Sequence, residues 1–88
     1  PYYTISYGQD LVNNENVANA YSKYLITDLL REKYGYDGVV CTDWGVTGDE
    51  GPTPEVFRGK PWGMETKTIA ERHYQVLMAG GDQFGGNN

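Results

Sequence analysis

An aspartate, Asp43, ends the short apolar segment 38–42 and is followed at once by Trp44. A continuous apolar run of this length, bounded by turn residues, is typical of a parallel β-strand buried on both faces. Because side chains alternate along a strand, Val39, Cys41 and Asp43 are expected on one face, with Asp43 at the end of an inward-facing column. In parallel α/β sheets the carboxyl ends of the strands form the floor of the binding crevice, which makes Asp43 a candidate chemical centre. The alternative is a strand-end aspartate that caps the following turn through the backbone, and position alone does not separate the two interpretations.

Tryptophan and polar side chains after this segment are the other candidates for binding or catalysis. Indole faces are broad apolar platforms that suit the C–H groups of pyranose rings, so Trp44 is a candidate sugar-binding residue, whereas Trp62 is expected to anchor its loop by burying its ring. Asp49 and Glu50 are adjacent and point in different directions, so both are expected to be solvated. His73 falls inside a predicted helix and is expected to pack or to lie at the surface rather than to act as a catalyst.

The sequence contains no metal or nucleotide fingerprint. Cys41 is the only cysteine, which excludes an internal disulfide and a cysteine-based metal site, and it is expected to be a small buried hydrophobe. If residues 43–54 are aligned with a calcium-binding loop, Gly45 and Pro54 fall where oxygen ligands are needed. The glycines match neither the dinucleotide-binding spacing nor the P-loop spacing.

The length and charge of the chain restrict its partners. With 88 residues it has one core at most, and a domain of this size buries only about 60–65% of its unfolded surface and is marginal alone. The formal net charge is −5 and the seven Lys and Arg residues are scattered, so nucleic acid is not an expected partner. No apolar run approaches the roughly 20 residues of a membrane span, so no membrane partner is expected. The chain begins at Pro1 without a methionine and ends in GGDQFGGNN, which predicts an excerpt of a longer protein.

The first half of the chain predicts a strand, a helix and a second strand. Residues 1–8 are rich in aromatic and β-branched residues, which favours a strand. Apolar residues recur at helical spacing from Val17 onward, Asn14 or Asn16 is placed to cap that helix, and Gly35 is placed to end it. With the apolar strand described above, this order fits one right-handed βαβ unit with parallel strands.

The second half predicts a long loop and another helix. Residues 44–65 are rich in glycine and proline, and a connection above about 12 to 15 residues is often a binding loop. A helix is expected over residues 68–78, where Thr68 and Glu71 have capping-box spacing and Gly80 follows the end. The segment DQF is expected to begin another strand.

Three segments of the chain resemble parts of a known family. The segment LITDLLREKYGYDGVVCTDWG, residues 25–45, closely resembles the part of glycoside hydrolase family 3 that carries its catalytic nucleophile, which typically reads LLTDxLRxExGFxGxVxSDWG. AGGDQF, residues 79–84, resembles the AGxDM segment of the family, and YYTISYG is similar to its preceding strand. The resemblance covers almost the whole chain and is weak in the loop. The positions that depart from the family pattern are Lys33, Tyr36, Thr42, Gln83 and Phe84.

The resemblance implies an α/β fold in which residues 1–88 are an incomplete N-terminal barrel domain, a fragment of a (β/α)8 TIM-like barrel from about the sixth strand to the start of the eighth. It implies that Asp43 is the nucleophile of a retaining exo-β-glycosidase that hydrolyses terminal β-linked glucosides or xylosides. That mechanism needs an ionised carboxylate about 5 to 5.5 Å from a protonated partner, so that a covalent glycosyl-enzyme ester forms and breaks down. Trp44 would line the sugar subsite, and Asp82 would be a structural hydrogen-bond acceptor. Tyr3 aligns with a tyrosine whose hydroxyl approaches the nucleophile, an assignment that Tyr2 or Tyr7 could also fill.

The resemblance also implies what the chain would work with. The acid/base residue of the family is a glutamate in a following α/β sandwich domain or a histidine in a barrel loop, and neither lies within these 88 residues. The implied partners are a β-glycoside or oligosaccharide substrate and the remainder of the parent chain, with no metal or organic cofactor. A periplasmic or secreted bacterial enzyme is favoured.

Two further expectations concern the chain by itself. Expressed alone, it is expected to be inactive and poorly folded, because its sheet edges would be unpaired and the barrel interior open to water. The alternative function is a non-catalytic carbohydrate-binding or structural barrel fragment, for which Trp44 and Trp62 would remain useful and Asp43 would not.

Overall fold

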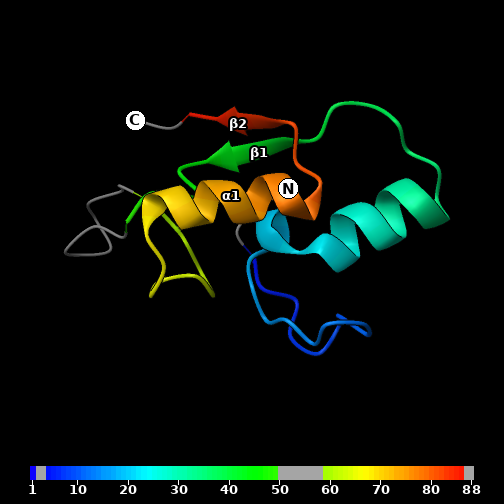
Figure 1. Ribbon diagram of the computed structural model, residues 1–88, viewed down its shortest axis with the longest axis horizontal. Helices are drawn as coiled ribbons and strands as arrows, with labels where there is room; N and C mark the ends of the chain where they lie inside the picture. Colours follow the sequence, from blue (N-terminus) through cyan, green and yellow to red (C-terminus); the bar gives the residue numbers. More distant parts are fainter. Residues whose placement is uncertain (2–3, 50–58, 87–88) are drawn as a thin grey trace.

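The computed structural model describes residues 1, 4–49 and 59–86. In this part of the chain, two short strands form one layer, one helix runs alongside it, and the other helical segments pack against that helix (Figure 1). The elements in chain order are the 3-10 turn η1 (Asn19–Tyr21), the π-helix η2 (Tyr24–Lys33), the strand β1 (Cys41–Trp44), the helix α1 (Ile69–Ala79) and the strand β2 (Gln83–Gly85).

The centre of the fold is a strand–helix–strand unit. β1 and β2 lie side by side and parallel, and α1 connects them while running back alongside the sheet (Figure 1). The pairing joins Cys41 to Gln83 and Trp44 to Gly85, with one irregularity of register between them. The expected α/β class is confirmed, and so is the short strand expected at DQF. Because the strands are parallel, their carboxyl ends lie at the same edge of the sheet.

The predicted first helix is divided in two. Ser22 separates η1 from η2 with an extended conformation, φ −88° and ψ 104°, and its hydroxyl accepts a hydrogen bond from Leu25 N at 3.2 Å. A serine hydroxyl that satisfies a free backbone N–H favours a helix start at this point over helix continuation. The expected caps are wrong, because Asn16 Oδ1 accepts instead from Gly8 N at 3.0 Å and Asn14 adopts φ +58°.

The other helix ends follow the predicted signals. Gly35 lies just beyond η2 with φ +72°. At the start of α1, the Thr68 hydroxyl accepts from Glu71 N at 3.1 Å and the Glu71 carboxylate accepts from Thr68 N at 3.0 Å, which is the predicted capping box. Gly80 ends α1 with φ +113°, and a Cβ at this position would lie 2.6 Å from Thr27 Oγ1 of η2. Glycine at position 80 therefore permits both the turn and the close approach of η2.

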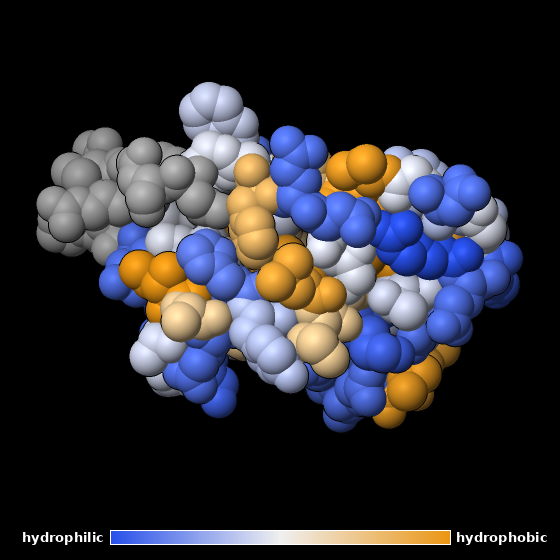
Figure 2. Space-filling view, turned by 45° about the horizontal axis from the view of Figure 1, so that its top comes forward, coloured by the Kyte–Doolittle hydropathy of each residue, from blue (hydrophilic) through white to orange (hydrophobic). Residues whose placement is uncertain are grey.

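Two small apolar clusters form the core. One joins η1 to α1, and the other joins η2, the residue before β1 and the end of α1; their buried members are Ala18, Tyr21 and Val76 in the first, and Ile26, Val40 and Ala79 in the second. Apolar residues also reach the surface, where they form several separate patches among polar ones on the face shown in Figure 2. Over the described ranges, no helix has both the length and the apolar character needed to cross a membrane.

The opening segment contacts the sheet without forming the predicted strand in its described part. Pro1 O accepts a hydrogen bond from Asp43 N at 2.9 Å. Ile5 makes a single antiparallel bridge with Ala18. Residues 2–3, which belong to the predicted strand, lie outside the described part. The parallel partner of β1 is therefore β2, and the predicted parallel pair with the opening segment is not formed by the described residues.

The prediction of a strand buried on both faces is wrong. Val40 and Thr42 are buried, with 5% and 4% exposure, whereas Val39 is 63% exposed and Cys41 is exposed. Cys41 is therefore not the small buried hydrophobe expected from its apolar neighbours. The alternation of the two faces is as predicted, but the helices cover only one side of this two-stranded layer.

Candidate functional site

Asp43 lies at the carboxyl end of β1 and is half-buried. Its backbone N donates to Pro1 O, and its carboxylate Oδ1 accepts from Trp44 N at 2.7 Å. In residues 1, 4–49 and 59–86, no basic side chain forms an ion pair with this carboxylate. This hydrogen bond from Trp44 N is the backbone contact expected if Asp43 caps the turn that follows β1. The same bond also fixes the orientation of the carboxylate. The geometry is thus compatible with a capping role and with a nucleophile held by one oxygen.

Trp44, the next residue, places an aromatic surface at the same end of β1. Its side chain is 68% exposed, and its indole lies against the backbone of Gly85 and Gly86 at the end of β2. A Cβ at Gly85 would lie 3.3 Å from Trp44 Cδ1, and one at Gly86 would overlap the indole. The ends of two neighbouring strands therefore bring a carboxylate and a partly open aromatic ring to one edge of the sheet.

The backbone of the turn after β1, residues 45–49, is held by hydrogen bonds from distant segments. Gly45 adopts φ +70°, and its carbonyl accepts from Lys60 N at 2.8 Å. The hydroxyl of Tyr21 in η1 donates to Val46 O, and both residues are fully buried. Burial raises the pKa of the Tyr21 phenol well above its ordinary value of 10.0, so the hydroxyl keeps its proton and remains a donor.

A buried arginine in α1 joins this turn to the loop before the helix. Arg72 is 2% exposed, and its guanidinium donates to three backbone carbonyls and one carboxylate. The acceptors are Met64 O at 2.9 Å, Glu65 O at 3.1 Å, Thr47 O at 3.1 Å and Asp49 Oδ1 at 2.7 Å. Burial of a charged group is tolerated when it is well hydrogen-bonded, and four of the five guanidinium N–H groups find an acceptor here.

His73, the next residue of α1, packs as expected. Its Nε2 lies 2.9 Å from Thr47 Oγ1, and its ring meets that of Phe84 edge to face, with centroids 4.7 Å apart and an interplanar angle of 74°. α1 therefore holds Thr47 at two points, the carbonyl through Arg72 and the hydroxyl through His73.

The remaining loop residues also occupy their expected environments. Trp62 is half-buried and packs against the cluster of η1 and α1, and its carbonyl accepts from Ala18 N at 2.8 Å, so it anchors the loop. The side chain of Asp49 is 72% exposed, as expected for a solvated residue, although it pairs with Arg72. Glu50 lies outside the described residues.

Asp82 lies at the other end of the strand pair and makes structural hydrogen bonds. Its Oδ2 accepts from Val40 N at 2.9 Å and from the Arg31 guanidinium, and its own N donates to Val40 O at 2.8 Å. The Val40 N–H, together with the Arg31 guanidinium, holds the pKa of Asp82 below its usual value of 3.8. Its contacts are those of the structural acceptor implied by the family resemblance.

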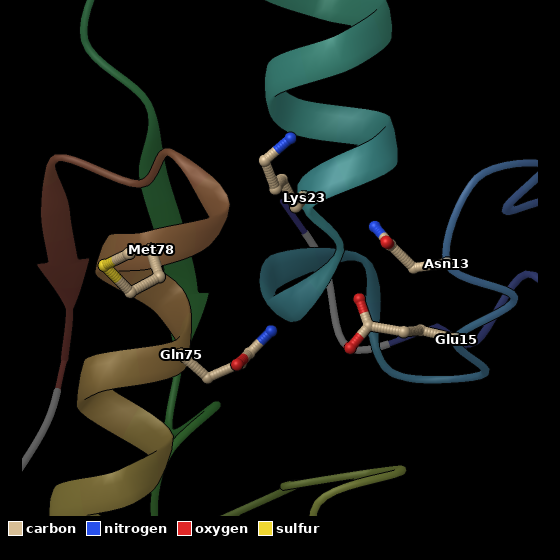
Figure 3. Close-up of a pocket in the computed structure, with 5 residues that line it drawn as sticks. All are labelled: Asn13, Glu15, Lys23, Gln75 and Met78. Carbon is tan, nitrogen blue, oxygen red and sulfur yellow. The ribbon is translucent and has the colours of Figure 1, made fainter.

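A cavity of about 380 Å³ lies apart from the strand ends, between the loop before η1 and α1 (Figure 3). Its lining residues are Asn13, Glu15, Lys23, Gln75 and Met78. Glu15 and Gln75 extend from opposite sides into the space between loop and helix (Figure 3). Burial, followed by the negative charge of Asp10, raises the pKa of Glu15. The cavity shares no lining residue with the edge that carries Asp43.

Of the residues predicted for the site, the structure brings Asp43 and Trp44 together, whereas Tyr3 lies outside the described part. The described residues contain no group of three or more His, Cys, Asp or Glu side chains arranged to hold a metal ion. Sequence reasoning missed Arg72. The available signal was its position on the face of α1 that carries Val76, where a charged residue interrupts an apolar stripe.

Comparisons with known proteins identify the class of protein to which this chain is similar. The chain is similar to a periplasmic beta-glucosidase/beta-xylosidase of Dickeya chrysanthemi, with 44% identity over an alignment of 84 residues; the match covers 82% of this chain and 12% of the relative. It is similar to probable beta-glucosidase C of Aspergillus oryzae, with 40% identity over 86 residues, 98% of this chain and 13% of the relative. A shorter match, with 46% identity over 35 residues, is to an exo-alpha-(1->6)-L-arabinopyranosidase of Bifidobacterium longum. It covers 40% of this chain and 5% of that relative.

The expected likeness to β-glucosidases is therefore confirmed, and the 88 residues correspond to one segment of such proteins. The chain spans 12% to 13% of the length of these β-glucosidase relatives. No family model matches the chain, and no solved structure matches it.

Proposed function

We propose that this chain is the nucleophile-bearing segment of a retaining exo-β-glycosidase of glycoside hydrolase family 3, which hydrolyses terminal β-linked glucosides or xylosides. The observation that carries the proposal is the juxtaposition of Asp43 and Trp44 at the carboxyl end of a parallel strand, in a chain similar to a segment of β-glucosidases. Asp43 is the nucleophile and Trp44 a surface for the sugar ring. Parallel α/β folds place their ligands at this edge of the sheet.

The chemistry has two steps. In the first, a carboxylate oxygen of Asp43 bonds to the anomeric carbon as the bond from that carbon to the leaving oxygen breaks, and an acid from the remainder of the parent chain protonates the leaving group. In the second step, the acid/base residue of the parent chain, now deprotonated, takes a proton from water. The water oxygen displaces the Asp43 carboxylate from the anomeric carbon and releases the sugar with retained configuration. The hydrogen bond from Trp44 N engages Oδ1, which leaves the other carboxylate oxygen for attack.

The proposed setting is an incomplete N-terminal (β/α)8 barrel domain, residues 1–88, from about the sixth strand to the start of the eighth. The parallel β1–α1–β2 unit and the contact of Pro1 O with Asp43 N support this assignment. The exposed face that carries Val39 and Cys41 would then line the barrel interior, covered by strands outside this chain. Tyr3 is proposed as a substrate-side residue because the family resemblance aligns it with a tyrosine whose hydroxyl approaches the nucleophile, a role that Tyr2 or Tyr7 could also fill.

The proposed partners are a β-glycoside or oligosaccharide and the remainder of the parent chain, which supplies the acid/base group. A periplasmic or secreted location is proposed because the Dickeya chrysanthemi relative carries the name of a periplasmic enzyme.

Covalent trapping tests the proposal in the intact parent protein. A 2-deoxy-2-fluoro glycoside with a good leaving group should leave one sugar on the peptide that contains Asp43, identified by peptide mass spectrometry. Asp43→Ala should lower kcat by several orders of magnitude with the fold retained, because the covalent route is lost. Asp37→Ala, which removes an exposed carboxylate of the same segment, is the matched control and should leave kcat unchanged. An adduct on Asp49 or Asp82, or a product of inverted configuration, contradicts the proposal.

The second candidate function is a non-catalytic carbohydrate-binding or structural barrel segment. The turn contact between Asp43 Oδ1 and Trp44 N is the observation that favours it. Sugar affinity without turnover in the parent, unaffected by Asp43→Ala, would support this alternative over catalysis.

A further inference from the structure

The indole of Trp44 rests on a stretch of backbone that carries no side chain. Trp44 pairs with Gly85 across the two strands, and Gly86 follows. A Cβ at Gly86 would lie 2.5 Å from both Cγ and Cε3 of Trp44, closer than real Cβ atoms approach other heavy atoms. The ring therefore lies where a side chain at position 86 would have to be, a close approach that glycine allows.

This contact leaves the indole supported and exposed at the same time. Trp44 is 68% exposed although it is one of the largest apolar side chains in the chain. Its neighbours at Gly85 and Gly86 offer only backbone atoms, so they support the ring without enclosing it. An aromatic ring with one supported side and open area remaining has the form of a platform for a flat apolar ligand surface, such as the C–H face of a pyranose.

We propose that Gly86 is a positioning residue for substrate binding, because its missing side chain sets the plane of the Trp44 platform on which the sugar ring stacks. The inference rests on the proposed function and adds to it the residue that orients the sugar subsite. A side chain at position 86 would push the indole away from the end of β2, and so tilt or shift the stacking surface beside Asp43. Substrate binding, rather than the chemical step, would be affected.

The test compares two glycines of similar backbone conformation in the parent protein. Gly86 has φ +52° and Gly35 has φ +72°, so alanine strains the backbone at both positions, but a Cβ at Gly35 meets nothing within 4 Å. Gly86→Ala is expected to raise KM for a β-linked disaccharide about 3- to 10-fold, the range of one stacked aromatic contact. The kcat should stay within about twofold, since no group that acts on the anomeric carbon is changed. Gly35→Ala should change neither constant.

Two further variants keep the test decisive. Gly86→Asn adds a Cβ while tolerating the left-handed backbone, so it should reproduce the effect on KM even if Gly86→Ala folds poorly. In a Trp44→Ala background, Gly86→Ala should have no further effect on KM, because the ring on which it acts is absent.

The outcomes separate this inference from the proposed function. If Gly86→Ala and Gly86→Asn both behave like Gly35→Ala, or if their effect persists in the Trp44→Ala background, the assignment of Gly86 is wrong while the glycosidase function stands. A parent protein that turns over no β-glycoside overturns the proposed function and the assignment of Gly86 with it.

Discussion

Replacing Arg72 by methionine should loosen the turn that follows the proposed nucleophile. Methionine has a similar length and remains compatible with the buried position, which is 2% exposed, so the main loss is that of the hydrogen bonds. Arg72 donates to three backbone carbonyls and to the Asp49 carboxylate, and these acceptors belong to two separate loops. Without the guanidinium, the turn at 45–49 and the loop at 61–66 lose their shared partner.

The magnitude follows from the number and kind of these bonds. A hydrogen bond from a charged donor contributes about 1.5–3 kcal/mol, so the three bonds to backbone carbonyls sum to roughly 4.5–9 kcal/mol before compensation. Burying the guanidinium costs several kcal/mol, which methionine avoids, so the net loss of local stability should be about 3–5 kcal/mol. Asp49→Asn should cost at most about 1 kcal/mol, because the side chain of Asp49 is 72% exposed and solvent screens the pair with Arg72.

Hydrogen exchange of the parent protein, read by mass spectrometry, measures this local opening. The informative amides are those of Lys60, which donates to Gly45 O, and Met64, which donates to Pro61 O. A loss of about 3 kcal/mol predicts exchange about two orders of magnitude faster at these amides in Arg72→Met.

Two results would refute the reasoning about Arg72. One is an acceleration of exchange below about tenfold in Arg72→Met, which would mean that the four hydrogen bonds contribute little beyond solvation. The other is an equal acceleration in Asp49→Asn, which would place the stabilisation in the exposed ion pair and not in the backbone carbonyls.

The remaining predictions concern pH and the isolated chain. The pKa of Asp82 is lowered by the N–H of Val40 and by Arg31, so its contribution to stability is present above its ordinary pKa of 3.8 and is lost as the pH falls through the lower, folded pKa. Asp82→Asn should therefore flatten the acid limb of a plot of urea midpoint against pH, and an unchanged limb would contradict this. Burial raises the pKa of Tyr21, so stability is complete below pH 10.0 and declines as the pH rises above it. Tyr21→Phe should remove that alkaline decline and, since Val46 O loses its donor, cost about 1–3 kcal/mol at neutral pH. The isolated 88-residue chain should show no glycosidase activity and no cooperative thermal transition; a sharp transition with dispersed amide resonances would show that its core is sufficient.

The features that the sequence predicted correctly depend on residues close together in the chain. The capping box of Thr68 and Glu71 and the left-handed Gly80 define α1 to within one residue at each end, because each signal acts within one turn of helix. The alternation of Val40 and Thr42 against Val39 follows from strand geometry alone. Asp43 and Trp44 lie at the end of β1, as the apolar run before them indicated, whereas their roles stay predictions.

The features that the sequence did not predict depend on which segments meet. The alternation of side chains separates the two faces of β1, but it does not show whether another layer of the protein covers each face. Cys41 was therefore predicted to be buried, whereas it is exposed. The division of the first helix was missed because a local contact, from the Ser22 hydroxyl to Leu25 N, competes with a helical periodicity that continues through it.

The same limit applies to the site. The acceptors of Arg72 come from two loops that the sequence places up to 25 positions away, and only the packing of α1 under the turn brings them within reach of one guanidinium. Gly86 meets Trp44 only because β2 pairs with β1 in parallel, which places residues 42 positions apart at one edge of the sheet. The sequence by itself determined which residues could do chemistry at the end of β1. Tertiary structure decided what supports them, because hydrogen bonds and ring contacts between distant segments form only when the chain folds.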